Sequence, residues 1–286
     1  MLSIPHKLAK GSAAHFIWLG LLSLLVLLLS ACQDQIMQPL VQGKPIYGVD
    51  ANNNLIRFGS MRPDSVTNRK HISGLQDSEY ILGIDFRPVD GRLYGVSNFN
   101  LIYVIDTVSA VALPARSTAF PTLLNGTFFG FGFNPVPDKI RIHSNAEQDL
   151  RIDPVTGVLA RDSTLAYDFS DVYFGFNPNI VGTAYTNSVA GAIITSLFAI
   201  DSNLDVLVTL PSPNNGKLVT IGDLGVNTND YVGFDISGPD GVAYASLTPA
   251  SNGNSGFYLI NLATGAATLL GSIGNFFPLH SIAIAP

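Results

Sequence analysis

Four oxygen-bearing side chains recur in a repeated setting along this chain, and together they could bind a metal ion. Asp85, Asn134, Asn177 and Asp235 each follow a Gly and one apolar residue. Carboxylate and amide oxygens are the ligands of hard cations such as Ca²⁺, which takes about six to eight of them. Only two of the four are acidic, and Pro or Gly follows soon after each, which is typical of a residue that ends a strand and opens a turn. The sequence therefore leaves two interpretations, a calcium site and ordinary turn chemistry.

The four side chains belong to a longer repeated pattern of strands. A hydrophobic strand with Gly and then Asp or Asn is followed by a turn and a second strand, and the copies lie at Gly83, Gly132, Gly175, Gly233 and Ala283. Repeats of roughly 40–50 residues built only of strands are typical of β-propellers. We therefore predict an all-β fold, a β-propeller of five four-stranded blades. Its inner strands would bring the four oxygens to one central channel.

The two ends of the chain complete the repeat. Residues 279–285 form an inner-strand pattern with no second strand after it, and residues 46–49 form a second-strand pattern with no inner strand before it. Pairing of these N- and C-terminal strands would close the ring and remove the exposed edges of an open sheet. The predicted propeller domain spans residues 46–286. A six-bladed ring would need a further, degenerate repeat within residues 115–128.

Acidic residues after the third strand of each blade have a structural explanation. Asp106, Asp153, Asp201 and Asn261 each stand where a strand turns back. Asp and Asn open such turns because their side chains accept backbone N–H bonds. The segment 50–54 begins like a calcium loop but lacks the Gly and the Glu that complete one. We predict turns at all of these places.

The other residues that could do chemistry give weaker patterns. His71, His143 and His280 are the histidines after residue 31, and none is spaced with another as a zinc site would be. We expect His143 to be a hydrogen-bonded turn residue, and Glu147 and Asp149 to be solvated loop acids. No nucleophile motif, zinc helix or phosphate loop is present.

Aromatic residues are concentrated in two segments, 128–133 and 173–176. Alternate members of each are expected to pack between blades. Any that protruded at a face would suit the stacking of a sugar or a peptide.

Several segments together resemble a known family of bacterial proteins. They are residues 81–88, 124–135, 138–142, 150–154 and 182–187. The chain from about residue 46 to residue 285 is similar to the domain of unknown function numbered 4394 (DUF4394). The resemblance implies a secreted or surface-anchored propeller-like domain, and it carries over no catalytic residue.

The first 31 residues indicate a lipoprotein signal peptide. Lys7 and Lys10 precede an apolar run over 16–29, and the run ends in Leu-Ser-Ala before Cys32. A short apolar run after a basic start fits a secretory signal, and small residues before a Cys resemble a bacterial lipobox. We predict that Cys32, the only cysteine, is acylated and that residues 32–45 tether the domain to a membrane. An ordinary signal peptide and an uncleaved anchor helix are the alternatives.

Charge excludes some partners. Without the signal peptide, Lys plus Arg falls from 15 to 13 against 21 Asp plus Glu, so the mature chain carries −8. Nucleic acid and a polybasic membrane contact both need clustered Lys and Arg. We therefore expect no nucleic-acid partner.

The sequence favours a function in binding. We predict a monomeric, non-enzymatic module of the cell envelope, anchored to a bacterial membrane, with a protein or saccharide ligand that the sequence does not identify and no cofactor. The alternative is a calcium-dependent hydrolase that uses Asp85, Asn134, Asn177 and Asp235 at the channel. A third interpretation is a purely structural or adhesive module.

Overall fold

Short strands make up almost all regular structure in the described part of the chain. The computed structural model describes residues 41–251, 253–274 and 278–286, which belong to one unit, Val41–Pro286. This unit contains β-strands and, among the residues described, no helix beyond one short 3₁₀ turn, η1 (Pro213–Asn215). The expected signal peptide and Cys32 lie outside the described residues.

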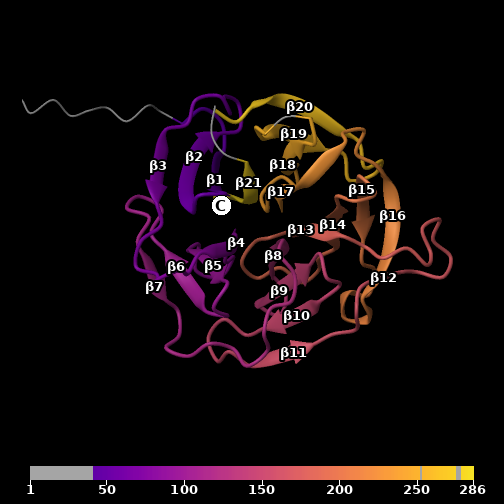
Figure 1. Cartoon of the computed structure of the whole chain (residues 1–286), viewed down its shortest axis with the longest axis horizontal. Helices are drawn as coiled ribbons and strands as arrows, with labels where there is room; N and C mark the ends of the chain where they lie inside the picture. The colour runs from indigo at the N-terminus through magenta and orange to yellow at the C-terminus, as the bar shows by residue number, and fades with distance from the viewer. Residues whose placement is uncertain (1–40, 252, 275–277) are drawn as a thin grey trace, which may run out of the picture. The chain divides into compact units, whose positions relative to one another are not determined.

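Five sheets, here called blades, follow one another around a central axis (Figure 1). In each blade the first strand of the repeat lies innermost and successive strands pair antiparallel outwards. The predicted five-bladed propeller is confirmed. The strands of the first two blades are, for blade 1, β4 (Ile81–Phe86), β5 (Leu93–Ser97), β6 (Ile102–Ile105) and β7 (Ala112–Pro114), and, for blade 2, β8 (Phe129–Asn134), β9 (Lys139–Ser144), β10 (Asp149–Ile152) and β11 (Leu159–Arg161).

Blade 3 carries an extra outer strand. A short segment, β12, pairs in parallel with the outermost strand of this blade, whereas the other four strands are antiparallel. The strands of blades 3 and 4 are β12 (Ala166–Tyr167), β13 (Ile180–Tyr185), β14 (Leu197–Asp201), β15 (Val206–Thr209) and β16 (Lys217–Asp223), then β17 (Thr228–Ile236), β18 (Ala243–Pro249), β19 (Gly256–Ile260) and β20 (Ala267–Ser272).

Blade 5 is assembled from both ends of the described chain. Its inner strand is β21 (Leu279–Ile284), and the next three are β1 (Pro45–Asp50), β2 (Asn54–Gly59) and β3 (Asn68–His71). β1 pairs antiparallel with β21, which confirms the predicted closure. The carbonyls of Gln42 and Lys44 accept hydrogen bonds from Met61 and Ser60, so the last residues of the expected tether already belong to the domain.

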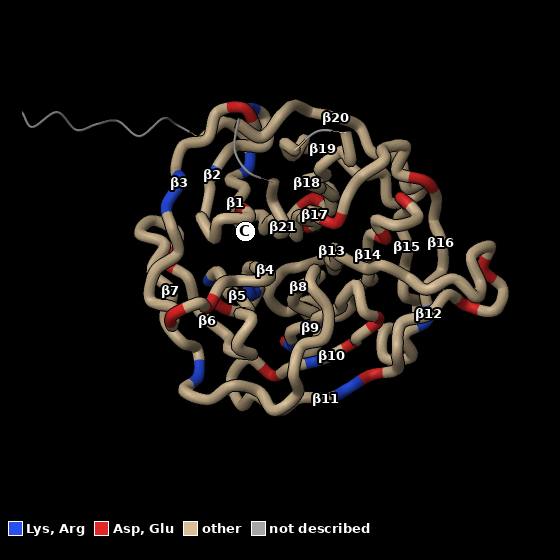
Figure 2. The backbone as a smooth tube through the Cα atoms, in the orientation of Figure 1, with Lys and Arg blue, Asp and Glu red and all other residues tan. Residues whose placement is uncertain are grey.

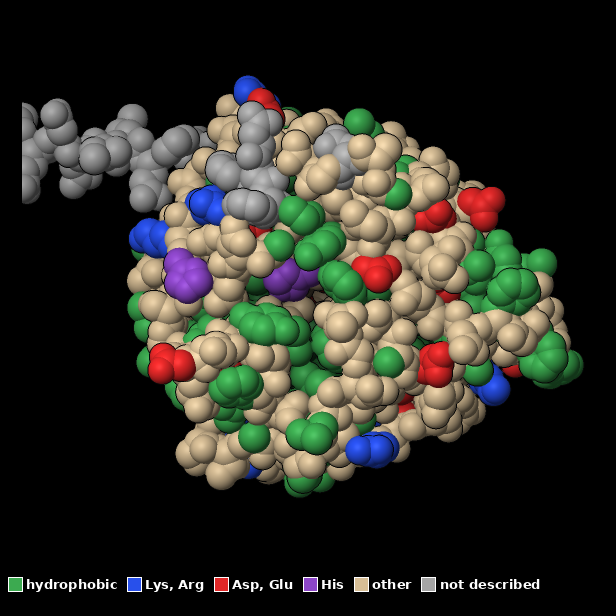
Figure 3. Space-filling model, viewed as in Figure 1, with side chains coloured by type: hydrophobic (Ala, Val, Ile, Leu, Met, Phe, Trp, Pro, Cys, Tyr) green, Lys and Arg blue, Asp and Glu red, His purple; other side chains and the backbone are tan. Residues whose placement is uncertain are grey.

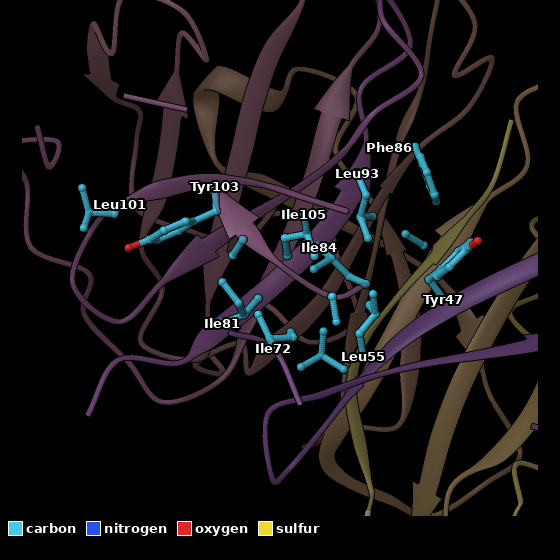
Figure 4. Close-up of a cluster of buried hydrophobic side chains, with 14 residues drawn as sticks. Tyr47, Leu55, Ile72, Ile81, Ile84, Phe86, Leu93, Leu101, Tyr103 and Ile105 are labelled. Carbon is cyan, nitrogen blue, oxygen red and sulfur yellow. The ribbon is translucent and has the colours of Figure 1, made fainter. Parts of the chain in front are cut away.

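Apolar side chains fill the spaces between neighbouring blades. Figure 4 shows one such cluster, in which Tyr47 and Leu55 from blade 5 meet Ile84, Leu93 and Ile105 from blade 1. All five are buried. β-branched and aromatic residues suit these strands because they pack well on a pleated surface. The turns between strands use the predicted chemistry, since Asp106 and Asp153 accept backbone N–H bonds two and three residues ahead.

The inner strands approach one another closely at one small residue in each blade. Cross-strand register places Gly83, Gly130, Gly182, Gly233 and Ser281 at this position. A Cβ added at Gly83 would lie 2.5 Å from Phe131 Cβ, and one at Gly233 would lie 2.6 Å from the Ile282 nitrogen. At the four glycine positions the missing side chain therefore serves the close approach of the inner strands rather than a left-handed turn.

Blade 3 corrects one sequence prediction. Gly175, Phe176 and Asn177 were expected in its inner strand, but they lie in a turn-rich segment before β13. The inner strand is Ile180–Tyr185, and Gly182 takes the place expected for Gly175. The Gly-Phe-Asn sequence of this segment matches the repeated pattern, but these residues do not pair with a neighbouring strand.

Candidate functional site

A pocket of about 580 Å³ opens at the junction of blades 2 and 3. Blade 2 contributes the turn between β8 and β9 together with Arg151 of β10. Blade 3 contributes Tyr185 at the end of β13, the loop before β14 and the stretch after β15 that contains η1. Pockets that bind small ligands commonly have volumes of about 300–1,000 Å³ and combine apolar walls with a few convergent polar groups. The junction has this composition.

A buried arginine lies behind the pocket. Arg141 of β9 is 1 % exposed. Its Nη1 lies 2.5 Å from Asp149 Oδ1 and 2.6 Å from Asp162 Oδ2. Figure 2 shows the basic and acidic positions along β9, β10 and β11. Two carboxylates around one guanidinium compensate a charge that would otherwise be costly to bury.

The same guanidinium reaches across to blade 3. Arg141 Nε donates to the Tyr185 hydroxyl at 3.2 Å, and Nη2 donates to Asn214 Oδ1 at 2.9 Å. Tyr185 and Asn214 both line the pocket. The buried ion pairs of blade 2 therefore fix the orientation of two polar groups on the opposite wall.

His143 extends this network inwards. It lies in β9, fully buried, and its Nδ1 is 2.9 Å from Thr183 Oγ1 of blade 3. Thr183 can approach because Gly130 stands in between, where an added Cβ would lie 2.3 Å from Thr183 Oγ1. His143 Nε2 lies 3.4 Å from Asp149 Oδ1. The predictions of a turn histidine at 143 and a solvated loop acid at 149 are wrong, because both side chains are buried within strands.

Charge compensation determines the ionisation of the network. Burial alone would raise the pKa of Asp149, but His143 and Arg141 hold it below its ordinary value. Burial would lower the pKa of Arg141, and its contacts with Tyr185 and Asp149 raise it instead. Burial also raises the pKa of Tyr185, so this phenol stays protonated at neutral pH.

The central ring contains two acidic side chains rather than four polar ones. Asp85 pairs with Tyr94 and Asp235 pairs with Tyr244, so these two occupy equivalent places. The same register places Gly132, Ala184 and Ala283 in the other three blades. Of the five equivalent inner-strand positions, two therefore carry a side-chain oxygen.

Both ring carboxylates join neighbouring blades. Asp85 Oδ2 accepts the backbone N–H of Phe133 at 2.6 Å, and Asp235 Oδ2 accepts that of Ile284 at 2.7 Å. Burial and the charge of Asp235 raise the pKa of Asp85, and burial raises that of Asp235 to about 7. These carboxyls satisfy backbone donors on the inner strands of blades 2 and 5.

The remaining two predicted ligands lie elsewhere. Asn134 ends β8, its Oδ1 accepts the N–H of Val136, and its side chain lines the pocket between blades 2 and 3. Asn177 is exposed in the segment before β13. The structure therefore brings together Asp85 and Asp235 but not all four residues, and it does not favour the calcium-dependent hydrolase. Within the described ranges, no group of three or more His, Cys, Asp or Glu side chains is arranged to hold a metal ion.

The two aromatic segments differ. Phe129, Phe131 and Phe133 are buried between blades as predicted. In the second segment Tyr173 packs against a buried cluster, whereas Phe174 and Phe176 are 60 % and 57 % exposed and protrude at the surface. Figure 3 shows hydrophobic side chains gathered at the edge of the molecule beyond β12 and β16.

The pocket residues were only partly visible in the sequence. Arg141, Asp149, Arg151 and Asp162 are charged residues inside or beside short strands, a pattern that could have indicated buried ion pairs. Asn214 gives no such signal, because its role depends on a contact with a residue 73 positions away. Among the residues described, no helix is long and apolar enough to span a membrane.

The fold and the pocket define a five-bladed β-propeller with a ligand-sized pocket between two blades. The chain belongs to the family described as "Domain of unknown function (DUF4394)", whose family model matches residues 54–283. This confirms the resemblance found in the sequence. A comparison with curated proteins finds no match.

Solved structures give only distant likenesses. A chain of a nidogen/laminin complex is 13 % identical with a TM-score of 0.49, covering 85 % of this chain and 99 % of its own. A protein of unknown function from Bacteroides thetaiotaomicron is 12 % identical with a TM-score of 0.49, covering 86 % and 68 %. Glutaminyl cyclase from Myxococcus xanthus is 14 % identical with a TM-score of 0.45, covering 68 % and 77 %. TM-scores below 0.5 carry no functional comparison.

Proposed function

We propose that this protein is an extracytoplasmic lipoprotein whose propeller is a non-enzymatic ligand-binding module, and that the pocket between blades 2 and 3 is its binding site. The observation that carries the proposal is the buried Arg141 network, which orients Tyr185 and Asn214 on the pocket wall. Polar groups held in place before a ligand arrives lower the cost of binding it.

Binding is favoured over catalysis by the position of the titratable groups. His143 and Asp149 are fully buried behind the pocket and do not line it. A general acid or base must come within hydrogen-bond reach of a substrate proton. Both side chains instead stabilise Arg141 and the contact between the blades.

A blocking variant tests the binding site. Ile194 lines the pocket and is 72 % exposed, so Ile194→Trp should fill the pocket without affecting folding. Val108→Trp, at a 67 % exposed position of blade 1 outside the pocket, is the matched control. We expect at least one member of a panel of oligosaccharides, short peptides and small carboxylic acids to raise the melting temperature of the wild type and Val108→Trp but not of Ile194→Trp.

Two results would contradict this assignment. If no panel member shifts the melting temperature of the wild type, the pocket is not the binding site of such ligands. If Ile194→Trp keeps the full shift, the ligand binds elsewhere. Hydrolysis of a lactone or phosphoester that depends on added Ca²⁺ would support the enzyme instead.

The membrane anchor is a separate part of the proposal, supported by the lipobox-like sequence before Cys32. Cells given labelled palmitate should incorporate it into the wild-type chain and not into Cys32→Ser. Equal labelling of the two chains would contradict acylation at this residue.

A further inference from the structure

Three polar side chains of the pocket lining have hydrogen-bond donors that the fold leaves unused, those of Arg151, Asn214 and Tyr185. The lining also contains the polar residues Asn134, Thr195, Ser196 and Thr209. Arg151 uses Nε and Nη2 to bind Asp162 at 2.6 and 2.9 Å. Its Nη1 makes no hydrogen bond within the described part of the chain, and a guanidinium has no acceptor. The side chain is about a third exposed and lines the pocket. Arg151 therefore brings to the pocket lining a donor that no described residue occupies.

Two further donors lie on the opposite wall. Asn214 uses its Oδ1 to accept from Arg141, which leaves the Nδ2 amide hydrogens for a ligand. The Tyr185 hydroxyl accepts from Arg141, so its own proton remains to be donated. Neither group donates to another residue of the described chain. Arg141 therefore occupies the Asn214 side-chain oxygen and one acceptor site of the Tyr185 hydroxyl, and it leaves the donors of both groups for a ligand.

The charge of the lining has one sign. Arg151 is its only charged residue among those described, and no carboxylate lines the pocket. Asp149 and Asp162, which neutralise the two arginines, are 0 % and 6 % exposed and are not among the lining residues. A ligand meets the Arg151 guanidinium, whose charge is shared with Asp162, and two neutral donors, and no carboxylate belongs to the pocket lining.

The other wall is aliphatic. Ile193 and Ile194, which are 91 % and 72 % exposed, line it together with prolines from both blades. The one aromatic residue of the lining, Tyr185, is 3 % exposed, so its ring offers no open face on which a sugar could stack. Branched aliphatic groups and proline instead bury apolar ligand surface, at roughly 25 cal/mol per Å².

From these two walls we infer that the pocket binds a carboxylate that carries an aliphatic group, with the carboxylate on Arg151, Asn214 and Tyr185 and the aliphatic part against Ile193 and Ile194. This inference rests on the proposed function and names the ligand class of the same site. Carboxylates accept from arginine in a planar, charge-assisted geometry. The free C-terminus of an aliphatic peptide and a free branched-chain acid share this chemistry.

Isothermal titration calorimetry with four small probes tests the inference on the mature protein. The probes are N-acetyl-Ala-Leu with a free carboxylate, the same dipeptide as its C-terminal amide, 4-methylpentanoate, and 4-methylpentanamide. We expect at least one carboxylate to bind about tenfold or more tightly than its amide, because a charge-assisted hydrogen bond is lost in the amide. Tighter binding of the dipeptide would identify a peptide C-terminus, and tighter binding of 4-methylpentanoate a free acid.

One substitution separates the donor wall from the fold. Asn214→Asp keeps an oxygen for Arg141 Nη2 but replaces the free amide hydrogens by a second oxygen, so carboxylate binding should fall by about tenfold or more. Asn203→Asp adds the same charge at an exposed turn of blade 3 outside the pocket and should bind as the wild type does.

The outcomes distinguish this inference from the proposed function. Carboxylate and amide probes that bind equally, no binding of either carboxylate, or full binding by Asn214→Asp would each overturn the inferred ligand class. If an uncharged saccharide binds and Ile194→Trp abolishes it, the binding module stands and the carboxylate inference fails. If Ile194→Trp leaves all binding intact, both fail.

Discussion

At the scale of single residues, Arg141 contacts four side chains from two blades. Asp149 and Asp162 belong to blade 2, and Tyr185 and Asn214 belong to blade 3, so the guanidinium makes polar contacts with both sheets. An ion pair this deep contributes little net stability compared with apolar packing, but breaking it leaves an uncompensated charge. The network therefore serves chiefly to position Tyr185 and Asn214 rather than to add net stability.

Replacing Arg141 by Met should be strongly destabilising. The variant leaves Asp149 and part of Asp162 without their cation, which typically costs about 3–5 kcal/mol. Urea denaturation, followed by far-ultraviolet circular dichroism, measures the loss in the free energy of unfolding. Adding Asp149→Asn to Arg141→Met should recover part of it, since the buried charge is then removed. A loss below about 1 kcal/mol would show that the network is not compensated in this way.

The two ring carboxyls make stability depend on pH in an unusual direction. The folded pKa of Asp235 is about 7, above the ordinary value of 3.8, so the folded state holds its proton more tightly than the unfolded state does. This contribution to stability is present at low pH and is lost as the pH rises from about 4 through about 7. Asp85 has a raised pKa and acts in the same direction.

Asp235→Asn should flatten this dependence. Asparagine keeps one oxygen for the Ile284 N–H but does not ionise. Between about pH 5 and about pH 8 the wild type should lose on the order of 2 kcal/mol more than the variant, measured by urea denaturation at both pH values. His280, whose burial lowers its pKa, has the opposite sign and is present in both proteins. Identical pH profiles would contradict the prediction.

At the scale of elements, the inner strands depend on small residues where blades approach. Gly130→Ala should destabilise the propeller by about 1–3 kcal/mol, as overpacking of a filled core does. The added Cβ would lie 2.3 Å from Thr183 Oγ1 and 2.8 Å from the Thr183 nitrogen, so a side-chain rotation cannot relieve the contact. Gly253→Ala is the control, because nothing lies within 4 Å of its added Cβ. Equal thermal midpoints for the two variants would show that the inner strands can separate freely.

The segment between β12 and β13 carries exposed aromatic residues, and it also binds the outer strand of blade 3, β16. Asp171 accepts the Thr220 N–H at 2.6 Å and the Thr220 hydroxyl at 3.0 Å. Asp168 contributes its backbone N–H to the carbonyl of Leu218. The segment thus covers the outer edge of β16, which would otherwise be open to pairing with another chain.

Removing the Asp171 carboxylate should uncover this edge. In Asp171→Ala the Thr220 amide loses its acceptor, and we expect its hydrogen exchange to become about tenfold faster or more because local opening becomes easier. Asp168→Ala is matched in charge, and the Asp168 carboxylate accepts its hydrogen bonds from Ser170 rather than from Thr220, so Thr220 should exchange as in the wild type. Unchanged exchange in Asp171→Ala would mean that the backbone alone holds the segment.

Elements that repeat could be predicted from sequence, and contacts between them could not. The inner strand at 81–86 and the turns at Asp106 and Asp153 could be predicted because their local sequence patterns recur in several blades. The site at the junction of blades 2 and 3 depends instead on which side chains meet across blades, as Arg141 meets Asn214. The same limit explains the error at Asn177. The sequence Gly-Phe-Asn resembles the end of an inner strand, and only the strand pairing of the folded chain shows that it is not one.

At the scale of the whole molecule, closure of the ring distributes its stability over both ends of the chain. β21 contacts β1 within blade 5, and Ser281 of β21 also binds the Ile84 N–H of blade 1 at 3.0 Å. Asp235 of blade 4 binds Ile284 from the other side. One strand near the C-terminus therefore holds three blades together, and the cost of bringing distant segments together is met only when it is in place.

A chain that stops before Leu279 should accordingly lose more than one strand. Without β21 the inner edges of β1, β4 and β17 lose their partners, and Asp235 and Ile84 lose theirs. We expect unfolding in urea to become shallow, with a reduced m-value, and the protein to associate through its open edge, because an unpaired edge strand is a template for other chains. Size-exclusion chromatography with light scattering measures the association. A chain that lacks only Pro286 keeps every one of these contacts and serves as the control. If the longer truncation unfolds with the midpoint and slope of the wild type, the ring does not depend on closure and each blade is stabilised chiefly by its own sheet.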